Sequence, residues 1–251
     1  MIDWREKLIA TAIHFGATLF LAAIAASVIF LLWYPPPFAT MIGGSELFML
    51  VVGCDLVLGP LLSLVVYDSR KTRRLLWLDY SVIGVLQIAS LVYGVMTTAE
   101  ARPVYVAFSM DRFEIVLAGD LRESELAAAR DPRFRDVPWT GPRYAAVVIS
   151  RADHEDALFE ALSGNEEHHR PKFYVPFESQ LENIRKRAAP LATLKQKKPA
   201  SSTLLPAALE GVDVPAERLG WLPVRHFRGF WTAIIDTDTG KPVAYIDLDP
   251  Y

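Results

Sequence analysis

The chain has 251 residues, of which 52% are hydrophobic and 22% are charged, and its formal net charge at pH 7 is −3. A slightly acidic chain without a cluster of aromatic and basic residues is a poor match for a nucleic-acid surface, so we expect no nucleic-acid partner. The one cysteine, Cys54, excludes an intramolecular disulfide and a cysteine-based zinc site.

Three long apolar segments predict a transmembrane domain of three helices over residues 1–98. The segments are 8–33, 47–67 and 75–97. Each supplies roughly the 20 residues that a helix needs to cross a hydrocarbon layer about 30 Å thick. The first segment is longer than the apolar region of a signal peptide, and no small-residue cleavage site follows it, so we expect it to remain as an anchor.

Basic residues at the ends of these segments predict their orientation. Arg5 and Lys7 precede the first segment, the 70–74 connection holds four Lys or Arg residues, and residues 34–46 contain none. Positive residues favour the cytoplasmic side of a bilayer. We therefore expect a multi-pass membrane protein with a cytoplasmic N-terminus and an extracytoplasmic domain over residues 99–251.

Polar residues inside the apolar segments are candidates for pairing or for partner binding, because a buried charge in lipid costs roughly 2.5–3.5 kcal/mol. Asp55 and Gln87 lie at similar depths in neighbouring segments, so we expect a hydrogen bond between them. His14 and Asp79 lie near the cytoplasmic ends of their segments, where an ion pair is expected. Two readings stay open, namely groups that only hold the helices together and groups that also engage a partner.

Gly59 and Pro60 interrupt the second apolar segment. Proline removes a backbone donor and clashes with the preceding turn, so the pair predicts a kink. The kink serves either packing within the bundle or a groove that accepts another transmembrane helix.

Residues 99–251 predict an α+β domain with antiparallel strands. The segment 195–202 is expected to be an exposed connection between elements. The expected strands are 103–108, 113–117, 144–149, 221–227, 230–236 and 243–248, and the expected helices are 121–130, 153–162 and 178–188.

No motif in the sequence indicates a catalytic residue, a metal site or a cofactor. The run Asp236–Gly240 is typical of a hairpin turn rather than a calcium loop, because the later bidentate acid is missing. His168 and His169 follow two glutamates in a polar stretch and are expected in a solvated loop. Phosphate-binding, nucleophile-elbow and zinc-protease motifs are also missing, so we do not expect an enzyme.

A series of short motifs is spread in order over residues 33–117. They combine aromatic and proline residues at the ends of the apolar segments with the polar residues inside them. The motifs are Trp33-Tyr34-Pro35, the run Asp55–Leu62, Leu78-Asp79, Gln87, Tyr93-Gly94, Arg102-Pro103 and Asp111-Arg112-Phe113.

These motifs resemble the TfpX/TfpZ family of type IV pilin accessory proteins. The resemblance implies an inner-membrane factor with three spans and a periplasmic domain that assists its cognate major pilin during assembly of type IV pili. A pilin awaiting assembly has a transmembrane helix and a periplasmic head. The hypothesis is that the second helix with Asp55, Gly59 and Pro60, together with Gln87, receives the pilin helix while the periplasmic domain docks the head.

A different class stays open beside this hypothesis. A membrane-anchored sensory or scaffold module would use the same architecture to bind a ligand or another envelope protein. An enzyme is the third reading, and no residue pattern supports it.

Overall fold

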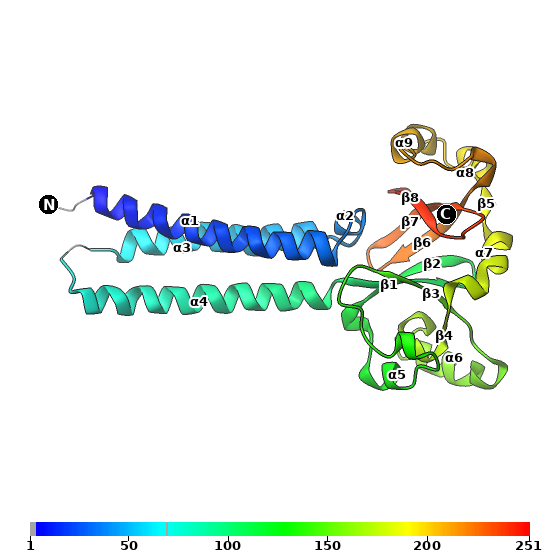
Figure 1. Cartoon of the computed structure of the whole chain (residues 1–251), viewed down its shortest axis with the longest axis horizontal. Helices are drawn as coiled ribbons and strands as arrows, with labels where there is room; N and C mark the ends of the chain where they lie inside the picture. The colour runs from blue at the N-terminus through cyan, green and yellow to red at the C-terminus, as the bar shows by residue number, and fades with distance from the viewer. Residues whose placement is uncertain (1–3, 69) are drawn as a thin grey trace. The chain divides into compact units, whose positions relative to one another are not determined.

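The computed structural model describes residues 4–68 and 70–251, apart from the side chain of Leu47, and the chain forms two compact units (Figure 1). The first unit comprises Met1–Pro35 and Gly43–Ala101, and the second comprises Pro36–Ile42 and Arg102–Tyr251. The sequence predicts one boundary after residue 98. In the structure the chain passes between the units twice more, because the short segment Pro36–Ile42, after the first apolar helix, belongs to the second unit.

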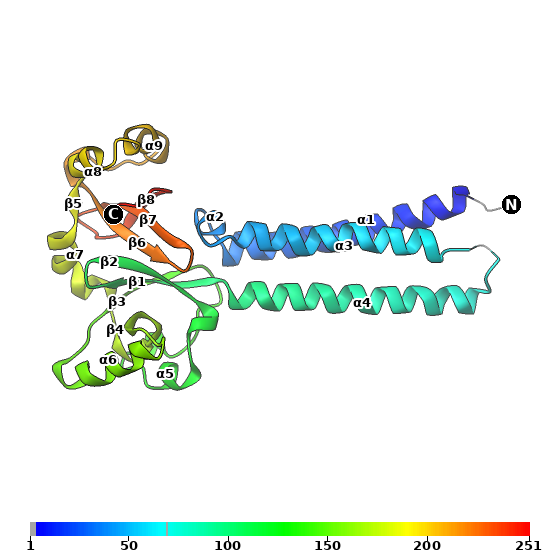
Figure 2. The same ribbon diagram turned by 180° about the vertical axis from the view of Figure 1, so that it is seen from behind.

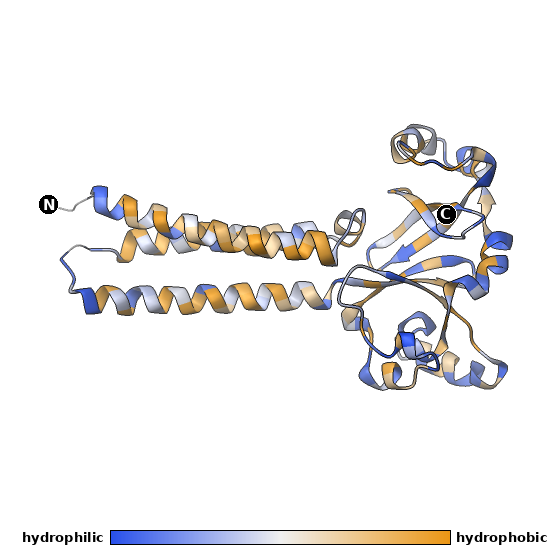
Figure 3. Cartoon of the chain, viewed as in Figure 1, coloured by the Kyte–Doolittle hydropathy of each residue, from blue (hydrophilic) through white to orange (hydrophobic). Residues whose placement is uncertain are grey.

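The first unit consists of long apolar helices. They are α1 (Trp4–Val28), extended by a π-helix (Ile29–Trp33), α3 (Gly44–Val66) and α4 (Arg73–Glu100). All three helices are long and apolar enough to cross a membrane, and between 6% and 11% of their most apolar windows is buried. Figure 3 shows hydrophobic residues along most of each helix, whereas the first turns of α1 and α4 are hydrophilic. Apolar surface on all sides of a helix suggests a lipid environment.

Two glycines allow close packing within the first unit. A Cβ atom on Gly94 of α4 would lie 2.5 Å from Val51 Cγ1 of α3, and one on Gly44 would lie 2.6 Å from Cε1 of Tyr34. The Tyr34 hydroxyl also donates a hydrogen bond to Thr98 O at 2.9 Å. A larger side chain at either glycine would force Val51 or Tyr34 to move.

Two lysines satisfy carbonyl groups at the C-terminus of α3. Lys7 Nζ donates to Leu64 O at 3.3 Å, and Lys71 Nζ donates to Val66 O at 2.8 Å. The last carbonyls of a helix have no partners within it, and the negative end of the helix dipole favours a cation there. Lys71 also forms an ion pair with Asp79 at 2.8 Å.

The second unit is built on an eight-stranded sheet with the order β4-β3-β1-β2-β6-β7-β8, and β5 pairs with β6 outside this path. The pairs β1–β3 and β2–β6 are parallel, whereas the others are antiparallel. The expectation of an antiparallel sheet is therefore wrong in part. Parallel neighbours need long crossover connections, and the connection from β2 to β6 covers residues 118–218. The strands are β1 (Pro103–Ser109), β2 (Arg112–Leu117), β3 (Arg143–Val147), β4 (Tyr174–Val175), β5 (Ala189–Pro190), β6 (Leu219–His226), β7 (Gly229–Asp236) and β8 (Pro242–Ile246).

One face of the sheet packs against α2 (Phe38–Ile42), the short helix between α1 and α3. Phe38, Met41 and Ile42 are each at most 5% exposed and belong to the same apolar cluster as residues of β1, β2, β6 and β7. The rings of Phe38 and Tyr245 of β8 lie 5.6 Å apart, edge to face. Helix α2 is thus part of the core of the second unit.

The opposite face carries two apolar clusters. One surrounds Tyr105 and Tyr174, and the other includes Trp221 and is covered by α8 (Leu191–Lys197) and α9 (Ser201–Ala208). Glu114 of β2 and Arg225 of β6 are register partners on the parallel strands between these clusters. A charged strip therefore separates the two apolar clusters.

Most of the predicted elements are confirmed, with shifted boundaries. The six predicted strands correspond to β1, β2, β3, β6, β7 and β8, and Asp236–Gly240 forms the turn between β7 and β8. Helix α6 (His154–Leu162) is also confirmed, whereas α5 (Glu123–Ala127) and α7 (Leu181–Arg187) are shorter than predicted. The segment 195–202 is mostly exposed, as predicted, but only residues 198–200 form a connection, because α8 and α9 extend into it from both sides.

Candidate functional site

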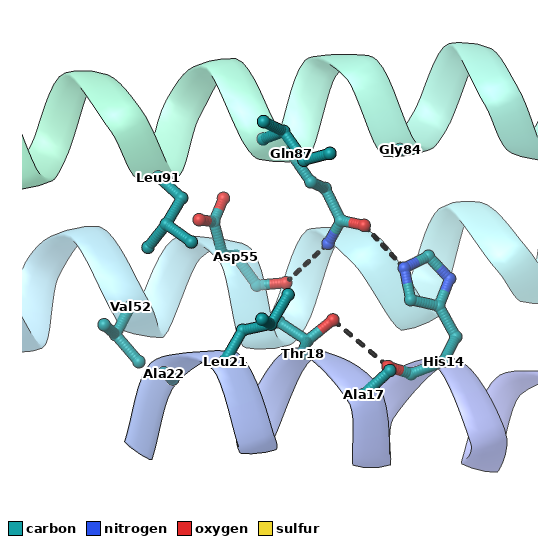
Figure 4. A pocket seen from close by; sticks show the side chains of 11 residues that line it. His14, Ala17, Thr18, Leu21, Ala22, Val52, Asp55, Gly84, Gln87 and Leu91 are labelled. Carbon is teal, nitrogen blue, oxygen red and sulfur yellow. Dashed lines mark hydrogen bonds between the residues drawn. The ribbon is translucent and has the colours of Figure 1, made fainter. Parts of the chain in front are cut away.

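The helices of the first unit line a pocket of about 180 Å³ (Figure 4). Its wall is mostly apolar and contains a few polar side chains, the composition typical of binding pockets. The lining residues are His14, Ala17, Thr18, Leu21 and Ala22 of α1, Val52 and Asp55 of α3, and Gly84, Gln87, Ile88 and Leu91 of α4.

Gln87 connects the three helices at this pocket. Its Oε1 accepts a hydrogen bond from His14 Nε2 at 2.5 Å, and its Nε2 donates to the main-chain oxygen of Asp55 at 3.5 Å (Figure 4). A Cβ atom on Gly59 would lie 2.1 Å from Gln87 Nε2. Gly59 therefore makes the room in which the amide of Gln87 reaches α3.

Pro60 lies buried inside α3, which continues through it from Gly44 to Val66. Proline has no backbone N–H, so Pro60 cannot donate to the carbonyl of Leu56, four residues earlier. Gln87 of α4 donates to the adjacent carbonyl, that of Asp55. A neighbouring helix thus supplies a donor to the turn in which α3 lacks one of its own.

The carboxyl group of Asp55 lines the pocket and has no hydrogen-bond donor from another described residue. Figure 4 shows it on the side of Leu91, away from the bonds that join Gln87 to its neighbours. Within residues 4–68 and 70–251, no hydrogen bond from another residue reaches its carboxyl oxygens. An unpaired carboxyl group inside a lipid bilayer costs free energy. Asp55 is therefore a candidate for binding a polar group of a partner.

The polar pairs differ from those expected from the sequence. Gln87 bonds to the main chain of Asp55 rather than to its carboxyl group. His14 bonds to Gln87, while Asp79 pairs with Lys71 of the α3–α4 connection. Depth along the helices placed Asp55 and Gln87 together correctly, but it could not indicate that Gly59 opens the backbone of α3 to the amide.

A second group of polar side chains lies in the second unit. Arg225 Nε donates to Glu114 Oε2 at 2.7 Å, and its guanidinium also donates to Glu166. Glu114 is 5% exposed, and His168 is 4% exposed. The expectation of a solvated loop is wrong for His168, because the 3₁₀-helix Glu167–His169 packs against the sheet and the main-chain oxygen of His168 accepts a bond from the buried Tyr174 hydroxyl.

Burial shifts the pKa values of two of these groups in opposite directions. It raises the pKa of Glu114 to about 7, although the hydrogen bond and charge of Arg225 oppose the shift. It lowers the pKa of His168 to about 2. In both cases the low-dielectric surroundings disfavour the charged form, so His168 is neutral at physiological pH.

Comparison with known proteins places this architecture in a family. The family described as "Fimbrial assembly protein FimB" matches residues 2–43. The chain is 31% identical over 245 residues to a protein named "Fimbrial assembly protein, serogroup I" from Dichelobacter nodosus, and the match covers 96% of this chain and 95% of the relative. A "Fimbrial assembly protein, serogroup E1" from the same organism matches with the same identity and coverage.

A third relative from Dichelobacter nodosus, "Fimbrial assembly protein, serogroups C1 and C2", is 36% identical over 119 residues, which cover 47% of this chain and 91% of that relative. The comparison with solved structures found no match. Because the first two relatives match over nearly their whole length, the chain belongs to the family of fimbrial assembly proteins.

Proposed function

We propose that this protein is an inner-membrane accessory factor that acts as a chaperone for a cognate major type IV pilin, by binding rather than by catalysis. Membership of the fimbrial assembly family supports a role in the assembly of type IV fimbriae. The resemblance of residues 33–117 to the TfpX/TfpZ family supports the pilin as the partner. The observation that carries the proposal is the Asp55 carboxyl group, which lines an apolar pocket and receives no hydrogen bond from any other described residue.

In the proposed topology the N-terminus is cytoplasmic and the second unit is periplasmic. The basic residues before α1 and between α3 and α4 favour this orientation. The shared core of the second unit independently supports the three spans, whichever orientation they take. Three spans put the α1–α3 connection and the chain after Ala101 on the same side of the membrane, and α2 packs in one apolar cluster with the sheet.

The pilin helix would lie in the pocket with a hydrogen-bond donor or an amine facing Asp55. Small residues of the pocket, Ala17 and Gly84, permit close approach of another helix. A Cβ atom on Gly84 would have no atom within 4 Å, so the wall has room at this point. The pilin head would dock on the second unit.

Photocrosslinking in native membranes tests this proposal. A photoreactive residue at Ala17 or Ile88, which line the pocket, is expected to capture the pilin. The matched control is Val65 of α3, which is 76% exposed and does not belong to the pocket lining. Equal capture at Val65, or capture of other envelope proteins alone, would instead support the scaffold or sensory module.

A substitution separates partner binding from helix packing. Asp55→Leu is expected to abolish pilin capture at Ile88 while the protein remains folded, because the partner loses its polar contact in lipid. Asp68→Asn, in the connection after α3, removes a carboxylate outside the helix and serves as control. Unchanged capture by the Asp55→Leu variant would show that Asp55 contributes only to the bundle.

A further inference from the structure

The polar pocket of the second unit has a volume of about 330 Å³, and the proposed function assigns it no role. It lies where Glu114 and Arg225 separate the two apolar clusters of the sheet face. The pocket is lined by Glu114, Ile115, Leu117, Asp120, Glu166, His168, His169, Arg225, His226 and Phe227.

The charges of this pocket favour a cation. Its described lining holds the carboxyl groups of Glu114, Asp120 and Glu166 against one guanidinium, that of Arg225. Asp120 and Glu166 alone exceed this single positive charge, although burial raises the pKa of Glu114 to about 7. Arg225 is already bonded to two of these carboxylates, so it is not available for an incoming anion. A ligand with positive charge would complement the remaining negative charge.

His168 adds a buried imidazole to the pocket. The residue is 4% exposed, and its Nδ1 atom has no hydrogen-bond partner among the described residues. This Nδ1 atom lies 3.7 Å from Glu166 Oε2. In the tautomer that carries its proton on Nε2, Nδ1 is an acceptor, and the ammonium or guanidinium group of a ligand can donate to it and to Glu166 together.

His226 adds a buried donor on the same pocket. Its Nδ1 atom accepts a hydrogen bond from the main-chain N–H of Arg228 at 3.3 Å, so its proton lies on Nε2. This Nε2 atom is buried and has no partner in the part of the chain that the structure describes. Neither a metal ion nor an ammonium group can accept a hydrogen bond from this N–H group, whereas the carbonyl oxygen of a peptide can.

From this donor and acceptor pattern we propose that the pocket binds a basic residue of a partner polypeptide, a lysine or an arginine. The side-chain cation lies among Glu166, Asp120 and His168, and the peptide carbonyl of the same residue accepts from His226. Phe227, which is 68% exposed at the rim, packs on the aliphatic stem of the side chain. The residues that line the pocket indicate the chemical class of the ligand. The further step that this residue belongs to the pilin head rests on the proposed function.

The first test uses the full-length protein in lipid nanodiscs with labelled histidines and three small probes. Nα-acetyl-lysine methylamide has the cation and the carbonyl groups, its norleucine analogue has only the carbonyl groups, and n-butylammonium has only the cation. The lysine probe is expected to shift the ring resonances of His168 and His226 saturably. The Glu166→Gln variant should bind it about tenfold more weakly, and Glu155→Gln, on the exposed surface of α6, should bind it normally.

Two results would overturn the assignment. Equal binding of the norleucine probe would show that the pocket does not recognise the cation. Equal binding of butylammonium would show that it accepts free amines and not specifically a residue of a polypeptide. Thermal melting of the Glu166→Gln variant checks that the loss does not come from unfolding.

Crosslinking in cells separates this site from the proposed function. With a photoreactive residue at Phe227, Glu166→Gln is expected to reduce capture of the pilin there and to leave capture at Ile88 intact. Unchanged capture at Phe227 would refute the pocket as the docking point while the pilin function stands. Binding of the lysine probe without pilin capture at either position would refute the pilin function while the pocket stands.

Discussion

Gly59 of α3 and Gln87 of α4 share one point of the helix bundle, because a Cβ atom on the glycine would lie 2.1 Å from Nε2 of the glutamine. The amide reaches the main chain of α3 only because position 59 has no side chain. The contact therefore depends on both residues, and it also positions the wall of the Asp55 pocket.

We expect Gly59→Ala to displace the amide of Gln87 and to break its bonds to His14 and to Asp55 O. Interhelical hydrogen bonds in membranes are worth about 0.6 kcal/mol each, so a destabilisation of about 1 kcal/mol is expected. If the mechanism is correct, the double variant Gly59→Ala with Gln87→Ala is no less stable than Gln87→Ala alone. Unfolding measurements in a bilayer check this cycle, and additive effects would contradict it.

Phe38→Ala should destabilise the second unit although the substitution lies between two apolar helices. Its ring is 5% exposed and packs in the sheet core, so we expect a loss of about 3–5 kcal/mol. Hydrogen exchange of the sheet amides measures the effect. Thr40→Ser, at an exposed position of the same short helix, is the control and should leave exchange unchanged.

His168 should make the second unit sensitive to acid. Its pKa is lowered from 6.5 to about 2 by burial, so the unfolded chain binds a proton below about pH 6.5 that the folded chain does not. The stabilisation is complete above pH 6.5 and declines as the pH falls towards 2, by up to about 1.4 kcal/mol per pH unit. His168→Gln should have a shallower loss of stability with falling pH, and the exposed His154→Gln should behave like the wild type.

Arg225→Met should be strongly destabilising, because it leaves the buried Glu114 without its closest cation. A broken buried ion pair costs about 3–5 kcal/mol. The effect should increase with pH, because the pKa of Glu114 is raised to about 7 and its charged form becomes dominant above that value. Arg112→Met removes a cation 3.7 Å from Glu114 and should have a smaller effect; an equal effect would contradict the assigned pair.

The sequence predicted the elements whose signal is local. Apolar length identified the three long helices, and alternation identified the strands that form β1, β2, β3 and β6–β8. The parallel pairs were missed because register between strands that are distant in sequence has no local signature. The same limit concealed the Glu114–Arg225 pair, although the alternation in β2 does place Glu114 opposite to its apolar neighbours Phe113 and Ile115.

For the candidate site, depth along the helices correctly brought Asp55 and Gln87 together, but the actual bonds depend on atomic detail. The absence of a Cβ at Gly59 decides which atom of Asp55 the amide reaches. His168 was assigned to solvent because a polar stretch of sequence does not reveal that its backbone turns into the sheet.

The position of α2 has a consequence for the order in which the protein is made. The ribosome completes Phe38–Ile42 before any residue of the sheet exists, and in the proposed topology this segment is held at the membrane by the helices on both sides of it. The sheet then folds onto a part of its own core that is already anchored. A fragment that begins at residue 99 would lack those side chains, so studies of the second unit in solution need a version that restores α2.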